Sequence, residues 1–550
     1  MSPRGKKMAL VASACAVAMS FSACGGSSNS SSSPQAGDPN AMIRVFSAEP
    51  QSPLIPGDTN EVGGSKPGNL MFSQLVAFDP DGKAVNEVAE SIKPNADNTA
   101  YTIKIKPGWT FTDGTPVTSR SFTRAWSYVA NSANAMKDSS SFATIKGYKE
   151  LQGAGHKGDE QLEGLKVTDD RTFTVDLNQP DSTFAIKVGY LAYAPLPESF
   201  YKDPKGFGEH PVGNGQYKFK SWEHNKSIQV VKNPDYKGQF KPRNGGVEFV
   251  VYTSGDSAYA DVQAGNLDLV ENVPTSASKT FTTDSSVQSY NKPGAVIEKF
   301  TIPAGLEHFR TDQEEGRLRR QAISMAIDRE SICKKVINGT ATPAADFTSP
   351  RIPGFTKDLK NEGNVQFNPK KAKELWAKAD AISPWPADHK FSFTYNADGD
   401  HGPIYKAVAN MVKTNLGIDA QDTPIPTFQE LRQNAVGRKI QGAFRTGWAP
   451  SYPSPEDYLT PNFASVSAEG KGSNDGDYKN PEFDDLLDKA AEASSAKDAN
   501  ALYAQAQGLL LRDLPSIPLH NRNANAVASK QVKSFRISWQ NIPVYWQVTK

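Results

Sequence analysis

Cysteine is scarce in this chain, whose 550 residues contain three, at positions 15, 24 and 333. Two of them lie in the amino-terminal targeting segment described below, so a mature chain beginning at Cys24 keeps one other thiol and cannot form an internal disulfide. Its stability must then come from core burial. Cys333 lies in an apolar helical pattern, which favours a buried, inert thiol over a nucleophile.

An excess of either charge is also lacking, because 61 Lys and Arg residues stand against 60 Asp and Glu residues, a formal charge of +1. A nucleic-acid-binding protein usually carries a basic domain or stripe, so we predict no nucleic-acid partner. Hydrophobic residues make up 37% and aromatic residues 10% of the chain. This composition excludes a disordered chain and a polytopic membrane protein, and the length suggests about three domains or lobes.

The motifs of common cofactor and metal sites are missing. The seven histidines are scattered, and no H-E-x-x-H, C-x-x-C or EF-hand loop occurs. Gly213-Asn214-Gly215 lacks the third glycine of a dinucleotide fingerprint, and there is no G-x-x-x-x-G-K-[ST]. We therefore predict no metal and no cofactor.

Two patterns could indicate catalysis, although we predict that the protein is not an enzyme. Ser331 and Lys334 match S-x-x-K, but the companion motifs S-D-N and K-T-G are absent. Acidic pairs at 314–315, 456–457 and 484–485 could serve glycoside hydrolysis, or could be helix starts, where the helix dipole favours negative charge. A surface hydrolase using Ser331 or an acidic pair remains an alternative.

The amino terminus has the pattern of a secretory signal. Arg4, Lys6 and Lys7 precede an apolar and small-residue run over 8–23, and Gly, Ser and Asn dominate the segment after Cys24. The sequence before Cys24 resembles the lipobox of bacterial lipoproteins, which implies a signal peptide over 1–23, a lipidated Cys24 and a flexible tether over 24–40. Cleavage before Cys15 and an ordinary secretion signal are the alternatives.

Alternating apolar and polar residues predict strands through the amino half. They cover 42–49, 101–106, 172–177, 216–222, 227–232 and 247–252, with a hairpin turn at 223–226. Thr118 follows the Asp113-Gly114 turn and is the predicted N-cap of a helix that buries Phe122 and Trp126.

The carboxyl half is predicted to be more helical. Helices are expected over 317–337, from 369 after an Asn368 cap, over 405–416, over 428–436 and over 481–511, with strands over 391–395, 443–448 and 517–527. The plan is mixed α/β without a repeat. No composition break marks a linker after residue 40.

Six groups of residues, in order along the chain, resemble the bacterial extracellular solute-binding proteins of family five, the oligopeptide and dipeptide receptors of ABC importers. They are 105–118 (IKPGWTFTDGTPVT), 211–222 (PVGNGQYKFKSW) with 232–236, 264–268, 318–323 with 326–329, 447–448 with 452–455, and 480–484. Each has its own scaffold explanation, such as the turn and capped helix of the first. Their number and order carry the resemblance.

The resemblance implies an α/β, two-lobed, hinged fold like that of periplasmic binding proteins, with an extra domain in the amino half. It places lobe I at 41–62, 184–298 and 521–550, the extra domain at 63–183, and lobe II at 299–520. It further implies a lipid-anchored, monomeric receptor outside the cytoplasmic membrane, on the periplasmic side if an outer membrane exists. Such a receptor encloses an extended peptide between its lobes and delivers it to an ABC permease.

Ligand-contacting residues follow from the same resemblance. Glu49 lies in a segment similar to the first ligand-pairing segment of the family, and Gly447-Trp448-Ala449 resembles the second. Tyr452 completes the aromatic pattern around them. Core packing is the competing interpretation for Trp448 and Tyr452.

One departure from the family pattern bears on the ligand. Peptide binders often carry Trp-x-x-Asp-Tyr, whose aspartate takes the peptide ammonium, and here Ser451 stands in its place. A hydroxyl offers no charge to an enclosed ammonium. Either Asp457 or Glu456 supplies the carboxylate, or the terminus is held differently, or the solute is not a simple peptide and is instead a sugar or a metal chelate.

Overall fold

The computed structural model describes residues 37–59, 61–397, 401–426, 428–470 and 472–550. The predicted signal peptide, Cys24 and most of the predicted tether lie outside these residues. Among the described residues, no helix combines the length and the apolar composition needed to cross a bilayer.

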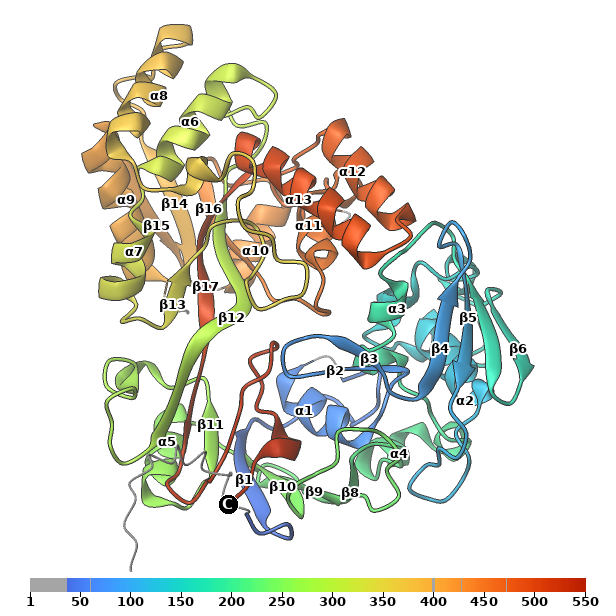
Figure 1. The fold of residues 1–550 in the computed structure, drawn as a ribbon. Helices are drawn as coiled ribbons and strands as arrows, with labels where there is room; N and C mark the ends of the chain where they lie inside the picture. Colours follow the sequence, from blue (N-terminus) through green and yellow to red (C-terminus); the bar gives the residue numbers. More distant parts are fainter. Residues whose placement is uncertain (1–36, 60, 398–400, 427, 471) are drawn as a thin grey trace, which may run out of the picture. The chain divides into compact units, whose positions relative to one another are not determined.

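One eleven-stranded sheet organises the described chain (Figure 1). In spatial order its strands are β15 (Ala420–Ile425), β14 (Phe391–Asn396), β16 (Ala443–Trp448), β12 (Gln288–Thr301), β17 (Ser516–Ala528), β11 (Leu269–Glu271), β1 (Met42–Ser47), β10 (Gly246–Val251), β9 (Ser227–Lys232) and β8 (Tyr217–Glu223), with β13 (Ala341–Pro343) beside β17. β1 is parallel to β10 and β11, and β14 is parallel to β15 and β16. The other pairs in this sheet are antiparallel.

β12 and β17 are long strands that pair with each other and connect the two halves of the sheet (Figure 1). β12 is 14 residues long and has a register shift between Pro293 and Ile297. A bulge of this kind bends a strand locally. The predicted lobe limits at 298/299 and 520/521 fall inside these two strands, and the limits themselves stay a prediction.

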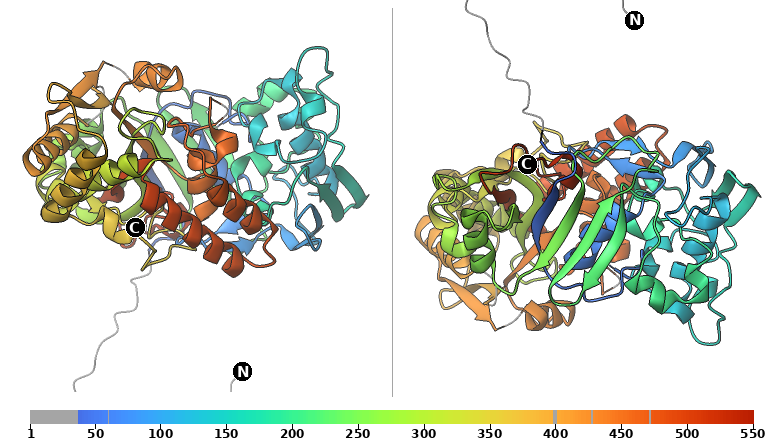
Figure 2. Two further views of the ribbon diagram at one scale, coloured as in Figure 1. Left: turned by 90° about the horizontal axis from the view of Figure 1, so that it is seen from above. Right: turned by 90° about the horizontal axis from the view of Figure 1, so that it is seen from below.

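A separate four-stranded sheet lies in the amino half. It consists of β4 (Ala89–Pro94), β5 (Ala100–Ile105), β7 (Thr172–Asp176) and β6 (Leu165–Asp169), and a small hairpin of β2 (Val76–Phe78) and β3 (Ala84–Asn86) precedes it. In Figure 2 this four-stranded part, in blue to cyan, and the yellow and orange helices of the carboxyl half lie on opposite sides of the described structure.

The helices confirm several predicted caps. In α2 (Ser119–Ala130) the cap Thr118 donates its N–H to the Ser121 Oγ, and the buried Trp126 Nε1 donates to the Tyr193 carbonyl. α8 (Pro369–Ile382) is capped by Asn368, as predicted. Further helices are α1 (Val62–Met71), α3 (Phe184–Lys187), α4 (Pro204–Glu209), α5 (Gly255–Ala264), α9 (Gly402–Leu416), α10 (Phe428–Val436) and α11 (Pro455–Phe463).

Two predicted long helices are interrupted. The one expected over 317–337 is α6 (Glu314–Met325), then α7 (Arg329–Ser331) and a π-turn over Ile332–Val336. The Asp328 carboxylate accepts from the Ser331 N–H and hydroxyl, which caps a new helix and ends the first. The stretch expected over 481–511 is likewise α12 (Pro481–Glu492) and α13 (Ala496–Asp513), because Ser495 caps the second.

The cores follow the two halves of the sheet. One cluster joins β1 residues such as Val45 to Trp126 and Phe173 of the amino-half domain, so this domain shares a core with the neighbouring half of the large sheet. A second cluster packs Phe300, Phe393 and Leu510 with the helices of the carboxyl half. Between the two halves, the connecting strands carry charged and polar side chains, including Glu298 and His520.

Candidate ligand-binding site

The end of β16 presents an incompletely paired strand edge. β16 pairs with β12 from Phe444 to Trp448, but on its other side it pairs with β14 only at Ala443 and Phe444. Beyond Phe444, no described strand pairs with this second edge. A short stretch of open backbone in a sheet can accept an extended chain as an added strand.

A cavity of about 340 Å³ lies at this edge. Gly447, Trp448 and Ala449, all predicted ligand contacts, line it together. Three arginines and two carboxylates contribute to the lining, namely Arg432, Arg445, Arg522, Glu298 and Asp475. The formal excess of one positive charge suits a ligand that carries a carboxylate.

Glu298 is a buried anion of this cavity and pairs with two of its arginines. Its carboxylate accepts from Arg445 Nη2 at 3.0 Å and lies 3.4 Å from Arg522 Nε. Burial opposes ionisation of Glu298, but the charges of Arg445 and Arg522 outweigh burial and lower its pKa. A Cβ at Gly447 would lie 3.1 Å from the Glu298 carboxylate, so glycine gives the carboxylate room at this point of β16.

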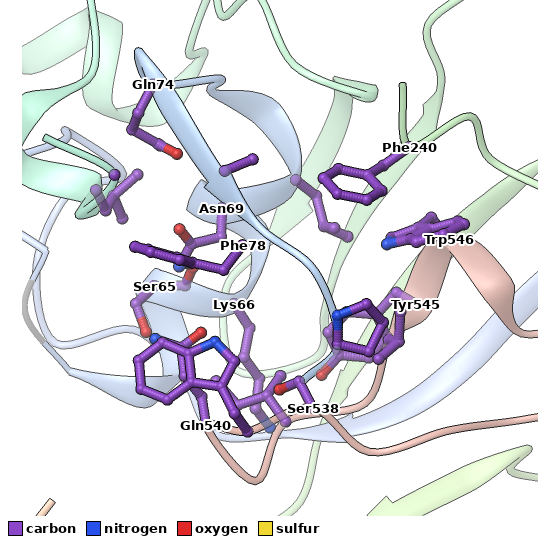
Figure 3. A pocket seen from close by; sticks show the side chains of 18 of the residues that line it. Ser65, Lys66, Asn69, Gln74, Phe78, Phe240, Ser538, Gln540, Tyr545 and Trp546 are labelled. Carbon is purple, nitrogen blue, oxygen red and sulfur yellow. Dashed lines mark hydrogen bonds between the residues drawn. The ribbon is translucent and has the colours of Figure 1, made fainter. Parts of the chain in front are cut away.

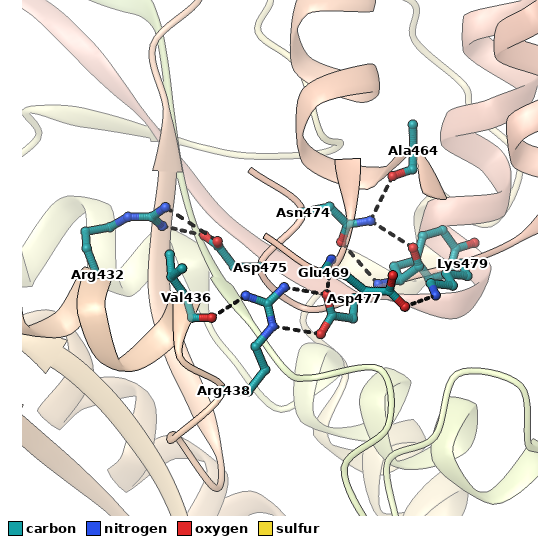
Figure 4. A network of polar contacts seen from close by, with 10 residues as sticks. Arg432, Val436, Arg438, Ala464, Glu469, Asn474, Asp475, Asp477 and Lys479 are labelled. Atoms are coloured by element: carbon teal, nitrogen blue, oxygen red, sulfur yellow. Dashed lines mark hydrogen bonds and ion pairs between the residues drawn. The ribbon is translucent and has the colours of Figure 1, made fainter. Parts of the chain in front are cut away.

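Ion pairs fix the loop on the other side of the cavity (Figure 4). Arg432 of α10 pairs with Asp475, and Arg438 forms two bonds with Asp477, at 2.6 and 2.9 Å. Asn474 donates to the carbonyls of Ala464 and Tyr478. These contacts position Ser473 and Asp475 at the cavity wall.

The turn after β16 is organised by Asp457, which is 4% exposed. Its Oδ2 accepts from the Ser451 N–H at 2.7 Å and from Trp448 Nε1 at 3.2 Å. Burial, and then the nearby negative charge of Glu456, raise the pKa of Asp457 to about 7. Asp457 therefore stabilises the turn after β16, and its Oδ2 already accepts two hydrogen bonds from the protein.

Glu456 is also engaged. It accepts from the Tyr452 hydroxyl and lies 3.7 Å from Lys187 Nζ, and Lys187 in turn pairs with Asp181 at 2.8 Å. The Lys187 ammonium lies 5.4 Å from the centre of the Tyr452 ring. Both carboxylates considered as substitutes for the family aspartate are thus paired within the protein.

Ser451 is exposed and lines a different cavity, of about 260 Å³. Lys66 and Asn69 of α1 and the aromatic side chains Phe78 and Trp546 contribute to the lining of this cavity (Figure 3). Ser451 is therefore separated from the cavity that Gly447, Trp448 and Ala449 share.

Glu49 lies just beyond β1 and lines neither of these two cavities. Its carboxylate accepts from the Asn225 N–H at 2.8 Å and contacts His224 Nδ1 at 2.9 Å. Hydrogen bonds to Glu49 and then to Glu209 raise the pKa of His224. In this structure Glu49 holds the turn between β8 and β9.

A family model decides the identity of the chain. The model described as "Bacterial extracellular solute-binding proteins, family 5 Middle" matches residues 83–470. The chain belongs to this family. As a family 5 solute-binding protein, it has the two-lobed, mixed α/β fold that the sequence predicts.

Individual relatives agree with this assignment. A dipeptide-binding protein of Bacillus subtilis is 28% identical over 479 residues, covering 85% of this chain and 84% of the relative. An oligopeptide-binding protein of the same organism is 27% identical over 521 residues, covering 91% of each chain. The unliganded open form of the murein tripeptide-binding protein MppA has a TM-score of 0.81 at 23% identity, covering 92% of this chain and 96% of that one.

The residues that suggested catalysis have structural partners in this family 5 protein. The Ser331 hydroxyl donates to Asp328 at 2.7 Å, whereas Lys334 pairs with Glu330 at the surface. The acidic pairs Glu314-Glu315 and Glu456-Asp457 lie in first helical turns. Cys333 is buried, and burial raises the pKa of its thiol to about 12.

Sequence reasoning missed the charged residues around the β16 edge. Arg445 had a local signal, because it lies two residues before Gly447 and so on the same face of the predicted strand. Glu298 and Arg522 had no such signal in the local sequence. They meet because β12 pairs with β17 in the centre of the sheet, although the two strands are more than 200 residues apart in the sequence.

Proposed function

We propose that this family 5 protein captures extended oligopeptides between its lobes and delivers them to an ABC permease in the membrane. The observation that carries the proposal is the open edge of β16 beside a cavity lined by Gly447, Trp448 and Ala449. The names of the dipeptide- and oligopeptide-binding relatives support a peptide as the ligand.

The geometry suggests how a peptide binds. Its backbone adds to the β16 edge through main-chain hydrogen bonds, which recognise any sequence. Its carboxylate lies toward Arg445 and Arg522, where the lining has an excess of positive charge. Bending at β12 and β17, which connect the two halves of the sheet, then closes the lobes over it.

The proposal includes the cellular setting. The basic start at Arg4, Lys6 and Lys7 and the apolar run over 8–23 support export, and Cys24 followed by a Gly- and Ser-rich tether supports a lipid anchor. The protein then acts as a monomer on the outer face of the cytoplasmic membrane, or on the periplasmic side where an outer membrane exists. Metabolic labelling with a fatty-acid analogue, compared between the native chain and Cys24→Ser, tests the anchor.

We expect peptides to raise the melting temperature of the purified protein. A ligand that binds only the folded state stabilises it by about 2.7 kcal/mol at 100 times its Kd, which corresponds to a rise of several degrees. Differential scanning fluorimetry with a library of two- to nine-residue peptides measures this shift. The proposal fails if no peptide in the library shifts the transition.

Trp448→Ala tests whether the peptide binds at the β16 edge, and Trp222→Ala is its matched control. Trp448→Ala removes a side chain from the cavity, so we expect it to reduce the peptide-induced shift, while the unliganded protein still unfolds cooperatively. Trp222→Ala, on β8 in the other half of the sheet, should retain the shift. Equal shifts in the two variants would move the ligand away from β16.

A non-peptide solute is the second candidate, and Ser451 favours it. Neither Asp457 nor Glu456 has a carboxylate free of protein partners to receive an ammonium. If a peptide ammonium nevertheless lies at Ser451, Ser451→Asp should tighten binding of free-amino peptides about tenfold, because a carboxylate adds a charge-assisted hydrogen bond. Isothermal titration calorimetry, with Ser451→Asn as the uncharged control, would remove this placement if affinity stayed the same or fell.

A further inference from the structure

A second cavity, of about 420 Å³, adjoins the one at the β16 edge. The two share Val296, Glu298 and Arg522, so a ligand lying along β16 reaches both. The second cavity lies where β12 and β17 connect the halves of the sheet, and residues from both halves line it, such as Asn272 and Asn338.

Asparagine is the most frequent polar residue in the lining of this second cavity. Five asparagines contribute to it: Asn272, Asn338, Asn523, Asn525 and Asn541. Its charged members, Glu298 and Arg522, carry opposite charges and lie 3.4 Å apart. This lining is therefore rich in hydrogen-bonding groups and has no formal excess of charge, in contrast to the lining of the cavity at the β16 edge.

Two polar atoms in this lining have no hydrogen-bond partner within the described protein, His520 Nδ1 and Asn541 Oδ1. His520 is 3% exposed, and burial lowers its pKa to about 4, so it is neutral at pH 7. A buried polar atom without a hydrogen-bond partner destabilises the protein. A ligand group that hydrogen-bonds to these atoms removes that destabilisation, whereas an apolar group does not.

The asparagines differ in how much bonding capacity they have left. Asn523 donates to Asn291 Oδ1 at 2.8 Å and accepts from the Thr342 hydroxyl at 2.9 Å. Asn525 Oδ1 accepts from the Val273 N–H at 2.7 Å. These two side chains stabilise the walls.

Asn541 is placed for a ligand by local backbone geometry. It has a left-handed backbone, with φ of 63°, and its amide lies against Gly294 on β12. A Cβ on Gly294 would come within 2.5 Å of Asn541 Oδ1 and would displace the side chain. Asn338, with φ of 53°, lies in the same lining.

We propose that this asparagine-lined cavity binds an uncharged carboxamide group of the ligand and makes the protein selective for peptides that carry glutamine or asparagine at one position. The inference rests on the proposed function. A carboxamide both donates and accepts, so it can pair with the donors and acceptors of this lining, among them the Asn541 amide. A charged side chain loses hydration in a lining with no formal excess of charge, and an aliphatic side chain leaves Asn541 Oδ1 unsatisfied.

The test uses a set of alanine-based pentapeptides with Gln, Glu, Lys or Leu at each position in turn, measured by isothermal titration calorimetry. At one position we expect Gln to bind about tenfold tighter than Leu, Glu or Lys. Asn541→Gly and Asn338→Gly should remove that preference, so that the Gln and Leu peptides bind each variant with similar affinity. Glycine keeps the left-handed backbone at both sites, so neither change should strain the fold.

Asn361→Gly is the matched control, because Asn361 also has a positive φ, of 67°, but lies outside the cavity. It should retain the preference for Gln. A preference for Gln at no position, or one that survives Asn541→Gly, overturns the inference while the proposed function stands. If no peptide binds but an N-acetylated amino sugar does, the result supports carboxamide binding in this cavity and contradicts the proposed peptide function. If neither ligand binds, the result contradicts both the carboxamide site and the peptide function.

Discussion

Arg320→Met is expected to lower the free energy of unfolding by about 3–5 kcal/mol. Arg320 of α6 is fully buried, and its guanidinium donates to five backbone carbonyls. These carbonyls belong to Ile302, Pro303, Phe309, Leu514 and Pro515. A methionine fills much of the same volume but leaves the carbonyls without donors, and each buried unpaired carbonyl is costly.

Urea denaturation followed by circular dichroism measures this loss. Arg310→Met is the matched control, because Arg310 forms an exposed pair with Asp312, and such pairs contribute about 0–1 kcal/mol. Equal stabilities of the Arg320 and Arg310 variants would show that the buried guanidinium does not hold these segments together.

Asp457→Asn is expected to flatten the pH dependence of stability by about 3 kcal/mol between pH 5 and pH 8. The folded protein raises the pKa of Asp457 from 3.8 to about 7. The folded state therefore binds this proton more tightly than the unfolded chain does. The resulting stabilisation is fully present below about pH 4 and is lost as the pH rises to about 7. Asparagine stays neutral throughout and can still accept from Ser451 and Trp448.

The comparison isolates Asp457 because other titrating groups are common to both proteins. Asp138 and Asp346 also have pKa values raised to about 6 by burial, and His520 has one lowered to about 4, so the wild-type profile is a sum. Asp485→Asn, which changes an exposed partner of Lys489, should leave that profile unchanged. Parallel profiles for the native protein and Asp457→Asn would contradict a neutral, buried Asp457.

Local patterns in the sequence were enough for most elements. The helix starts at Thr118 and Asn368 depend on side chains within a few residues, and both predictions were confirmed. The helices expected over 317–337 and 481–511 were wrong in extent. A cap inside an apolar period, such as Asp328 or Ser495, leaves the periodicity almost intact and is easily overlooked.

The sequence likewise placed some of the predicted ligand-binding residues together and misplaced others. Gly447, Trp448 and Ala449 were named from the sequence and share one cavity, but Ser451 lines another and Glu49 holds a turn. Whether any of them contacts a ligand stays a prediction. The position of Asp457 behind Ser451 depends on the angle between β16 and α11, which no local pattern encodes.

The amino-acid sequence by itself determined the family, the mixed α/β plan and the export signal that we predict, because these depend on composition and on motifs read in order. Only the tertiary structure brought Glu298, Arg445 and Arg522 together and built the asparagine-lined cavity beside them. The physical reason is that β12 and β17 pair across more than 200 residues of sequence, and the charges and hydrogen bonds of a site depend on distances in space.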